Sequence, residues 1–327
     1  MKLKIIMLIY IVILIISAYP DTNDFLETVA KGNIFEIQNA IRNGANVNFK
    51  DKNYVTPLMT AIRNKREIKV IKLLLDKGAD INARDIFGIT SLGYAAAISQ
   101  DLEIIKLLLD KGADINARDK FGNTPLAYAV KNNQNPEVVK ILLRNGADIN
   151  ALNGNGTMLF VYAATNTKNQ KVSEVMKILC ENGANINAEN KKGLTPLMLV
   201  VADSENLEVI KAIKILLENG ANVNAKNKYG WTPLMSAAAF NNNPEVIKML
   251  IDNGADINDR DKSRATPLMY AAMNNQNPEV IKLLLNSGAD AKLKSNEGKT
   301  AFDYAGENKN VKGTDVYWRL NDLQYKK

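Results

Sequence analysis

The chain has 327 residues, with 42 lysines and arginines against 35 aspartates and glutamates, which gives a formal charge of +7. It contains one cysteine and no histidine, which excludes an intramolecular disulfide, a thiol–imidazole pair and any histidine-based acid–base or metal site. The mildly basic balance is more typical of a solvated lysine-rich surface than of a nucleic-acid site.

Residues 1–18 have the pattern of a secretory signal peptide. A start that bears two lysines precedes an apolar run from Ile5 to Ile16, and small residues at 17 and 18 follow it. Cleavage after Ala18 would place the protein in the periplasm, on the cell surface or outside the cell. The alternative is an uncleaved membrane anchor, but a helix from Ile5 to Tyr19 would reach only roughly 22 Å, short of the ~30 Å hydrocarbon core.

Residues 22–50 are expected to form an N-terminal capping helix pair. Phe25, Leu26 and Val29 lie on the first predicted helix, and GNIFEIQNAIRNGANVN supplies the second. No turn signature precedes them, and the outer side is more polar, as an open-ended stack requires.

The stretch from Asp119 to Ala151, DKFGNTPLAYAVKNNQNPEVVKILLRNGADINA, recurs with substitutions along the chain. Its polar start predicts a β-hairpin turn. Thr124 and the proline after it predict a short capped helix, and Asn135 with the next proline predicts a second helix that ends at Gly146. The equivalent Gly-Ala pairs are spaced by 34 or 37 residues and begin at positions 44, 78, 112, 146, 183, 220, 254 and 288.

This order of turn, TPLxxA helix, loop and VVKxLLxxGADxNA helix is similar to the ankyrin repeat, and the similarity covers essentially everything after residue 22. The resemblance implies an all-α repeat solenoid, an ankyrin-like stack of helix-turn-helix units with projecting β-hairpin loops. Seven repeats are expected over residues 51–294, and a C-terminal capping repeat and helix over residues 295–327. The chain is expected to form one elongated, monomeric domain.

Two positions of the first helices differ from the family's pattern or recur from repeat to repeat: the residue after the TPL motif, and an alanine. The residue after the TPL motif is commonly histidine in the family, but here it is Met59, Met198, Met235 or Met269 in four of the repeats. Packing between repeats explains the methionines better than a soft-metal site does, and inter-repeat hydrogen bonding is left in question. Alanine recurs on the first helices and predicts their close approach, and Val200 interrupts this row.

Cys180 stands where other repeats have leucine or isoleucine, so it is expected to be a buried core thiol. The fifth and sixth repeats are irregular in other ways. Residues 158–160 read MLF where TPL should stand, after the flexible NGNG of 153–156, and each of these two repeats has three extra residues between its helices. The insertions are interpreted as drift at exposed loop tips, or as a raised feature that a partner recognises.

The sequence does not predict that catalytic side chains come together in one place, as they do in an active site. The acids are spread along the repeats, several as helix-start residues, and no phosphate loop or zinc spacing is present. The Asp and Asn residues of the ADIN segments suggest calcium only weakly, because they occur once per repeat. We therefore expect no enzyme activity, no cofactor, no metal and no small-molecule substrate.

In the family, loop tips and inner helices line up as a strip that binds other proteins. The tips of this chain carry aromatic and cationic residues, diluted by acids such as Asp85, Asp119 and Asp261. The candidate partner-binding residues are Tyr54, Phe87, Lys120, Phe121, Lys191, Lys192, Lys228, Tyr229, Trp231 and Arg264. An alternative is that the aromatic rings only pack on neighbouring tips.

The sequence thus predicts a non-enzymatic protein–protein interaction module with an acidic or mixed-charge partner. The alternative function is nucleic-acid or anionic-polymer binding through the basic tips.

Overall fold

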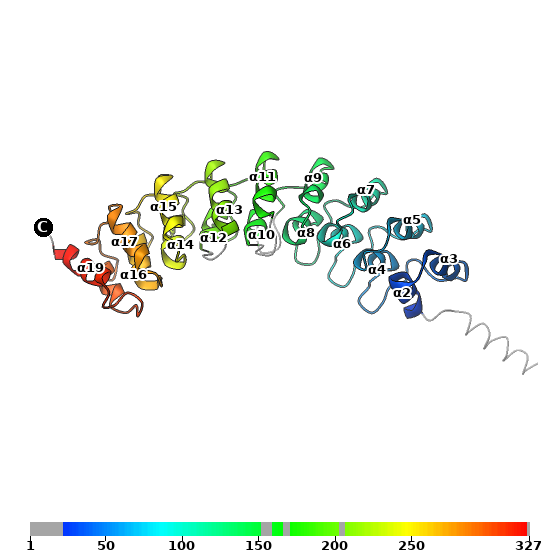
Figure 1. Cartoon of the computed structure of the whole chain (residues 1–327), viewed down its shortest axis with the longest axis horizontal. Coiled ribbons are helices and arrows are strands. Elements are labelled where there is room, and N and C mark those ends of the chain that lie inside the picture. The colour runs from blue at the N-terminus through cyan, green and yellow to red at the C-terminus, as the bar shows by residue number, and fades with distance from the viewer. Residues whose placement is uncertain (1–21, 152–158, 166–170, 203–206, 326–327) are drawn as a thin grey trace, which may run out of the picture. The chain divides into compact units, whose positions relative to one another are not determined.

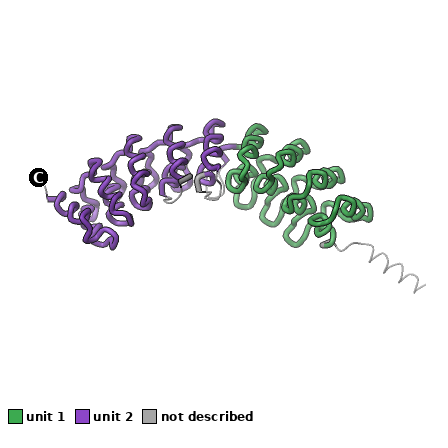
Figure 2. Tube along the Cα trace, viewed as in Figure 1, with its two compact units in different colours: residues 1–148 green, residues 149–327 purple. Residues whose placement is uncertain are grey.

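The computed structural model describes residues 22–151, 159–165, 171–202 and 207–325. Regular structure in these ranges is helical throughout (Figure 1), and none of these residues lies in a β-strand. No helix within them is long and apolar enough to cross a bilayer. The contacts divide the chain into two compact units, unit 1 up to residue 148 and unit 2 from residue 149 (Figure 2).

Unit 1 consists of helix pairs, the first of which is the pair expected to cap the N-terminus. Its helices are α2 (Thr22–Lys31), α3 (Ile34–Arg42), α4 (Pro57–Arg63), α5 (Ile68–Asp76), α6 (Ser91–Ile98), α7 (Leu102–Asp110), α8 (Pro125–Asn132) and α9 (Pro136–Arg144). Unit 2 continues the same alternation. Its helices are α10 (Leu159–Thr165), α11 (Val172–Glu181), α12 (Pro196–Val200), α13 (Leu207–Glu218), α14 (Pro233–Phe240), α15 (Pro244–Asp252), α16 (Pro267–Asn274), α17 (Pro278–Asn286), α18 (Ala301–Ala305) and α19 (Asp315–Tyr325).

In the repeat at residues 119–151, both helices begin and end as the sequence predicts. The Thr124 side chain accepts a hydrogen bond from the Ala127 amide at 3.3 Å and caps α8. Asn135 caps α9 by accepting from the amide of Glu137 at 3.1 Å. The second helix is followed by Gly146 at a φ of 89°, a left-handed conformation that glycine adopts without steric cost.

The core runs between successive helix pairs. On the second helices, Val138 and Leu142 are fully buried, as their apolar stripe predicts. On the first helices, Ala95 and Ala129 are at most 1% exposed, which confirms that these helices need small side chains where they meet. Val200 is buried at the corresponding position of α12.

The row of methionines is part of the same core. Met59, Met198, Met235 and Met269 are each at most 2% exposed. This confirms packing between repeats as their role.

Cys180 is only partly buried, so the expectation of a fully buried thiol is wrong. The equivalent Leu143 is also partly exposed, because this position lies at the edge of the second-helix stripe. Burial still raises the pKa of the Cys180 thiol above its ordinary value.

Two sets of asparagines bond each repeat to its neighbour within a unit. In the outer asparagine ladder, side-chain amides donate to the carbonyl of the helix-ending glycine in the next repeat at 2.8 to 3.3 Å. Its members are Asn48, Asn82, Asn116, Asn187, Asn224 and Asn258. These amides provide polar contacts between repeats in a chain that lacks the family's histidine.

The inner asparagine ladder is buried. Its members lie just after the first helix and donate to carbonyls of the preceding repeat at 2.8 to 3.1 Å. They are Asn133, Asn241, Asn275 and Asn308. The sequence interpretation treated these residues as loop and missed both ladders.

The irregular fifth and sixth repeats are described only in part. The NGNG segment, Met158 and the inserted segments at 166–170 and 203–206 lie outside the described residues. Of the three residues expected in place of TPL, Leu159 and Phe160 begin α10 and are buried. Helix α12 has only five residues, against eight in α14.

Candidate partner-binding surface

The described tips are tight turns, most of them closed by one Asp or Asn side chain. In the tip at residues 119–123, the Asp119 Oδ1 atom accepts hydrogen bonds from the amides of Phe121 and Asn123, both at 2.8 Å. Backbone bonds from Asp119 to Asn123 and from Gly122 to Asp119 complete the turn at 3.0 Å each. The loops therefore project as expected, but as turns rather than as paired strands in the described residues.

A tyrosine ties three of these tips to the first helix that follows. The Tyr128 hydroxyl donates to Asp119 Oδ2 at 2.6 Å, and Tyr94 and Tyr270 bond Asp85 and Asp261 in the same way. Burial and the neighbouring carboxylate raise the pKa of each tyrosine above its ordinary value.

These three aspartates are at most 8% exposed. The expectation that Asp85, Asp119 and Asp261 dilute the surface charge of the tips is therefore wrong. Their carboxylates point inward because the turn amides and the tyrosine hydroxyl take up their hydrogen bonds.

Neighbouring tips are bonded through their backbones. The amide of Lys120 donates to the carbonyl of Phe87 at 2.8 Å, and the amide of Lys262 donates to Tyr229 at 3.1 Å. A Cβ atom on Gly88 would lie only 3.1 Å from the Lys120 amide nitrogen, so the adjacent turns touch. The tips of each unit thus form a row with a fixed backbone.

In unit 1 this row presents aromatic side chains to solvent. Phe87 is 52% exposed and Phe121 is 61% exposed, and Lys120 between them is also exposed. Each of these two residues therefore keeps more than half of its surface exposed. The structure brings these three predicted residues together.

Tyr54 and Arg264 occupy a different position of the turn from Phe121. Their φ angles are 60° and 61°, and they stand where other tips have a left-handed glycine such as Gly122. Counting from the turn-closing Asp51 and Asp261 places both residues at this position. Both are exposed, so they remain on the surface, but they are not counterparts of Phe121.

In unit 2 the row is mainly cationic. Lys191, Lys192 and Lys228 are exposed, and Tyr229 is 64% exposed. Within the described ranges, the side chains of Lys192 and Lys228 have no ion-pair partner. Lys262 stands on the next tip, and its side chain also has no ion-pair partner among the described residues. Three successive described tips of unit 2 therefore carry lysine.

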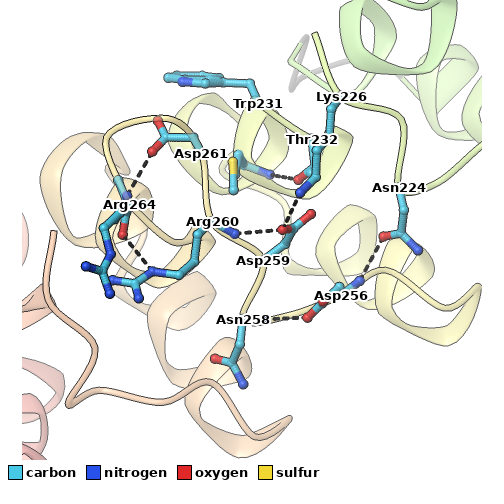
Figure 3. A network of polar contacts seen from close by, with 12 residues as sticks. Asn224, Lys226, Trp231, Thr232, Asp256, Asn258, Asp259, Arg260, Asp261 and Arg264 are labelled. Carbon is cyan, nitrogen blue, oxygen red and sulfur yellow. Dashed lines mark hydrogen bonds and ion pairs between the residues drawn. The ribbon is translucent and has the colours of Figure 1, made fainter. Parts of the chain in front are cut away.

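Other cations near these tips are part of the scaffold (Figure 3). Lys226 forms an ion pair with Asp259 at 2.6 Å, and Arg260 donates to the carbonyls of Arg264 and Lys294. The outer ladder passes beside them, from Asn224 through the amide of Asp256.

Trp231 is a surface residue of a different kind. Its ring lies 4.3 Å from that of Tyr270 and 6.1 Å from that of Phe240, between centroids, and the residue is partly buried. It therefore belongs to the surface of the first helices, together with Phe240 and Met273, which are 52% and 37% exposed. The sequence interpretation missed these last two, although an apolar Phe240 where α8 and α16 end in asparagine was a usable signal.

No group of three or more His, Cys, Asp or Glu side chains in the described part of the chain could hold a metal ion. The tips and first helices thus expose mainly aromatic and cationic side chains. Such residues are enriched where proteins bind one another.

Comparison with known proteins identifies a family that agrees with the observed fold. A family model described as ankyrin repeats (3 copies) matches residues 25–119, 92–190, 160–261 and 237–316. No curated protein sequence matches the chain. Ankyrin repeats generally mediate protein–protein interaction and are typically non-enzymatic. With matches that span most of its length and a helix-pair array in both units, the chain belongs to the ankyrin-repeat family.

Proposed function

We propose that this protein is a non-enzymatic module that binds a partner protein along its tip rows and the adjoining surface of its first helices. The observation that carries the proposal is the pair of exposed rings at Phe87 and Phe121, on two tips joined by a 2.8 Å backbone hydrogen bond. Exposed aromatic residues on a rigid backbone lose little conformational freedom on binding, which favours affinity.

The first-helix surface of unit 2 supports the same function. Trp231 and Phe240 stack there with ring planes 25° apart, beside the partly exposed Met273. A partner that contacts the tips of unit 2 can extend over these side chains. Aromatic residues in such clusters frequently dominate binding energy.

The test compares two sets of exposed phenylalanines. We expect Phe87→Ala with Phe121→Ala to abolish capture of the partner, because the pair removes the aromatic centre of the unit 1 row. Phe35→Ala is the matched control, since Phe35 is 62% exposed on α3, away from the tips, and this variant should capture the partner normally. Captured proteins are identified by mass spectrometry, and far-UV circular dichroism checks that all variants are folded.

Retention of the partner by the tip variant would contradict the site, as would equal loss in the Phe35 control. The lysines of unit 2 favour an acidic or mixed-charge protein partner. They also define the competing function, the binding of nucleic acid or another anionic polymer. A logarithm of the binding constant that falls linearly and steeply with the logarithm of salt concentration would favour the polymer, and a shallow dependence would favour a protein bound by aromatic contacts.

We also propose that the protein is exported, to the periplasm, the cell surface or the medium. The support is the sequence pattern of residues 1–18, a lysine-bearing start, an apolar run and a small residue at the cleavage position. An uncleaved N-terminal anchor would keep the array at a membrane surface.

A further inference from the structure

The helix α19 lies at the C-terminal end of unit 2 (Figure 1). One of its faces is buried and the other is exposed. Leu320 is fully buried and Val316 is 6% exposed, and they fix the helix against the end of unit 2. The exposed residues of α19 lie on the side opposite Leu320. They are Asp315, Trp318, Asp322 and Tyr325. We call these four residues the outer stripe.

The outer stripe is unusual for a helix face that no described residue covers. Such a face is normally polar. Here Trp318 is 57% exposed and Tyr325 is 77% exposed. Trp318 has one aromatic neighbour, Tyr317, which meets it edge-on with the ring centroids 5.1 Å apart.

The spacing of the outer stripe is that of a helix-pairing seam. Its members are separated by three, four and three residues, so they share one side of the helix and fall at successive a and d positions of a heptad, with aspartates at a and aromatic residues at d. Leu320 lies at the f position, on the far side of the helix, which agrees with its burial against the array. The face that a partner helix would contact is therefore the face that the array leaves open.

We propose that the outer stripe pairs with the outer stripe of a second copy of the chain, in antiparallel orientation about a two-fold axis level with Leu320. Antiparallel pairing about this axis sets Asp315 opposite Tyr325 of the second copy. It also sets Trp318 opposite Asp322 of the second copy. Each carboxylate then faces a side chain with a hydrogen-bond donor, a phenol O–H or an indole N–H.

The parallel orientation is disfavoured by the same residues. It would set Asp315 against Asp315 and Asp322 against Asp322, and like charges directly opposite one another oppose association. Within the described chain neither aspartate has an ion-pair partner, so both carboxylates are available. Arg319, next to Trp318, brings a cation toward the Asp322 position of the opposite helix.

The proposed dimer interface is small, and its size determines how tightly the two copies are expected to associate. Two helices of 11 residues bury less surface than the ~1,200–2,000 Å² of stable complexes, so the dimer should be weak and concentration-dependent. The proposal revises the sequence-based expectation of a monomer. It does not use the tip rows, so it and the proposed function can fail separately.

The first test is sedimentation equilibrium on the purified full chain over a range of concentrations. We expect a reversible monomer–dimer equilibrium, with a dissociation constant raised at least tenfold in Trp318→Ala. Tyr325→Phe, which removes only the hydroxyl, should raise the constant by a smaller factor. Tyr229→Ala is the matched control, because it removes a similarly exposed aromatic residue from unit 2 and should leave the equilibrium unchanged.

The second test reports orientation by disulfide trapping in a Cys180→Ser background, which removes the only native thiol. Asp315→Cys combined with Tyr325→Cys should give a covalent dimer on mild oxidation, because antiparallel pairing brings these positions together. Asp315→Cys alone should remain uncrosslinked. A wild-type chain that stays monomeric throughout, or efficient crosslinking by Asp315→Cys alone, would overturn the proposal.

Discussion

Asparagine provides side-chain contacts between neighbouring repeats at two depths. At the surface, Asn258 donates to the carbonyl of Gly288 at 3.2 Å and accepts from the amide of Asp290 at 2.8 Å. In the interior, Asn275 donates to the carbonyls of Ala238 and Asn241 at 2.8 and 3.0 Å. One amide side chain can donate and accept at once, which suits a position between two backbones.

These two depths predict different energetic costs. Asn275→Ala should lower the free energy of unfolding by about 2–3 kcal/mol, because buried carbonyls lose their donor where water cannot replace it. Asn258→Ala should cost only about 1 kcal/mol, since water can reach the carbonyl it leaves. Urea unfolding measures both, with Asn274→Ala as an exposed control of near-zero effect. Equal losses at Asn275 and Asn258 would show that burial does not govern the ladders.

The turn and its following helix act as one element wherever tyrosine reaches back to aspartate. Asp119 holds the turn amides with one oxygen and Tyr128 with the other, so the tip that carries Phe121 cannot tilt without breaking a 2.6 Å bond. The same tie occurs at Asp85 and Asp261, but not at Asn190 or Asn227. The tips at Asn190 and Asn227 are closed by the asparagine side chain and backbone bonds.

This tie makes stability depend on alkaline pH. The pKa of each tied tyrosine is raised in the folded chain, whereas an unfolded tyrosine ionises near its ordinary value of about 10. The stabilisation is therefore fully present below about pH 10 and is lost as the pH rises above it, because ionisation then favours the unfolded chain.

The check is a comparison of unfolding free energies between pH 8 and 11. The wild type should lose stability more steeply above about pH 10 than the triple variant Tyr94→Phe, Tyr128→Phe, Tyr270→Phe, which cannot ionise at these sites. Ultraviolet titration of the 11 tyrosines should show a late-ionising group that the triple variant lacks. Parallel pH profiles for the two proteins would refute the tie.

At the scale of the molecule, the periodic signals in the sequence were sufficient for the fold. Thr-Pro and Asn-Pro pairs mark helix starts, and the Gly-Ala pairs mark helix ends, because these residues have strong local preferences that stacking does not override. Phe87, Phe121 and Tyr229 were also predicted as surface residues, since each stands two residues after the turn-closing residue, where these tips expose the side chain.

What could not be read from the sequence depends on contacts and backbone geometry that only the folded chain creates. The inner ladder of Asn133 and its equivalents looks like an ordinary polar loop until the preceding repeat is placed against it. The inward turn of Asp119 depends on Tyr128, nine residues further on. The left-handed backbone of Tyr54 could not be predicted, because its turn lacks the glycine that marks this position elsewhere.

Export is a prediction for the whole molecule and has a direct measurement. Sequencing the N-terminus of the protein purified from its native host should give Tyr19, because cleavage after Ala18 removes the apolar segment. Recovery of chains that begin at Met1 from a membrane fraction would instead establish an anchor.

The asparagine ladders also decide how the array responds to acid. Repeats joined through histidine gain or lose charge near neutral pH, so their contacts can loosen as a compartment acidifies. The ladders of this chain consist of amides and backbone groups, none of which titrates between about pH 5 and 8. Repeat stacking should therefore be the same inside the cell and in a mildly acidic environment outside it, and any acid sensitivity of partner binding must originate in the partner.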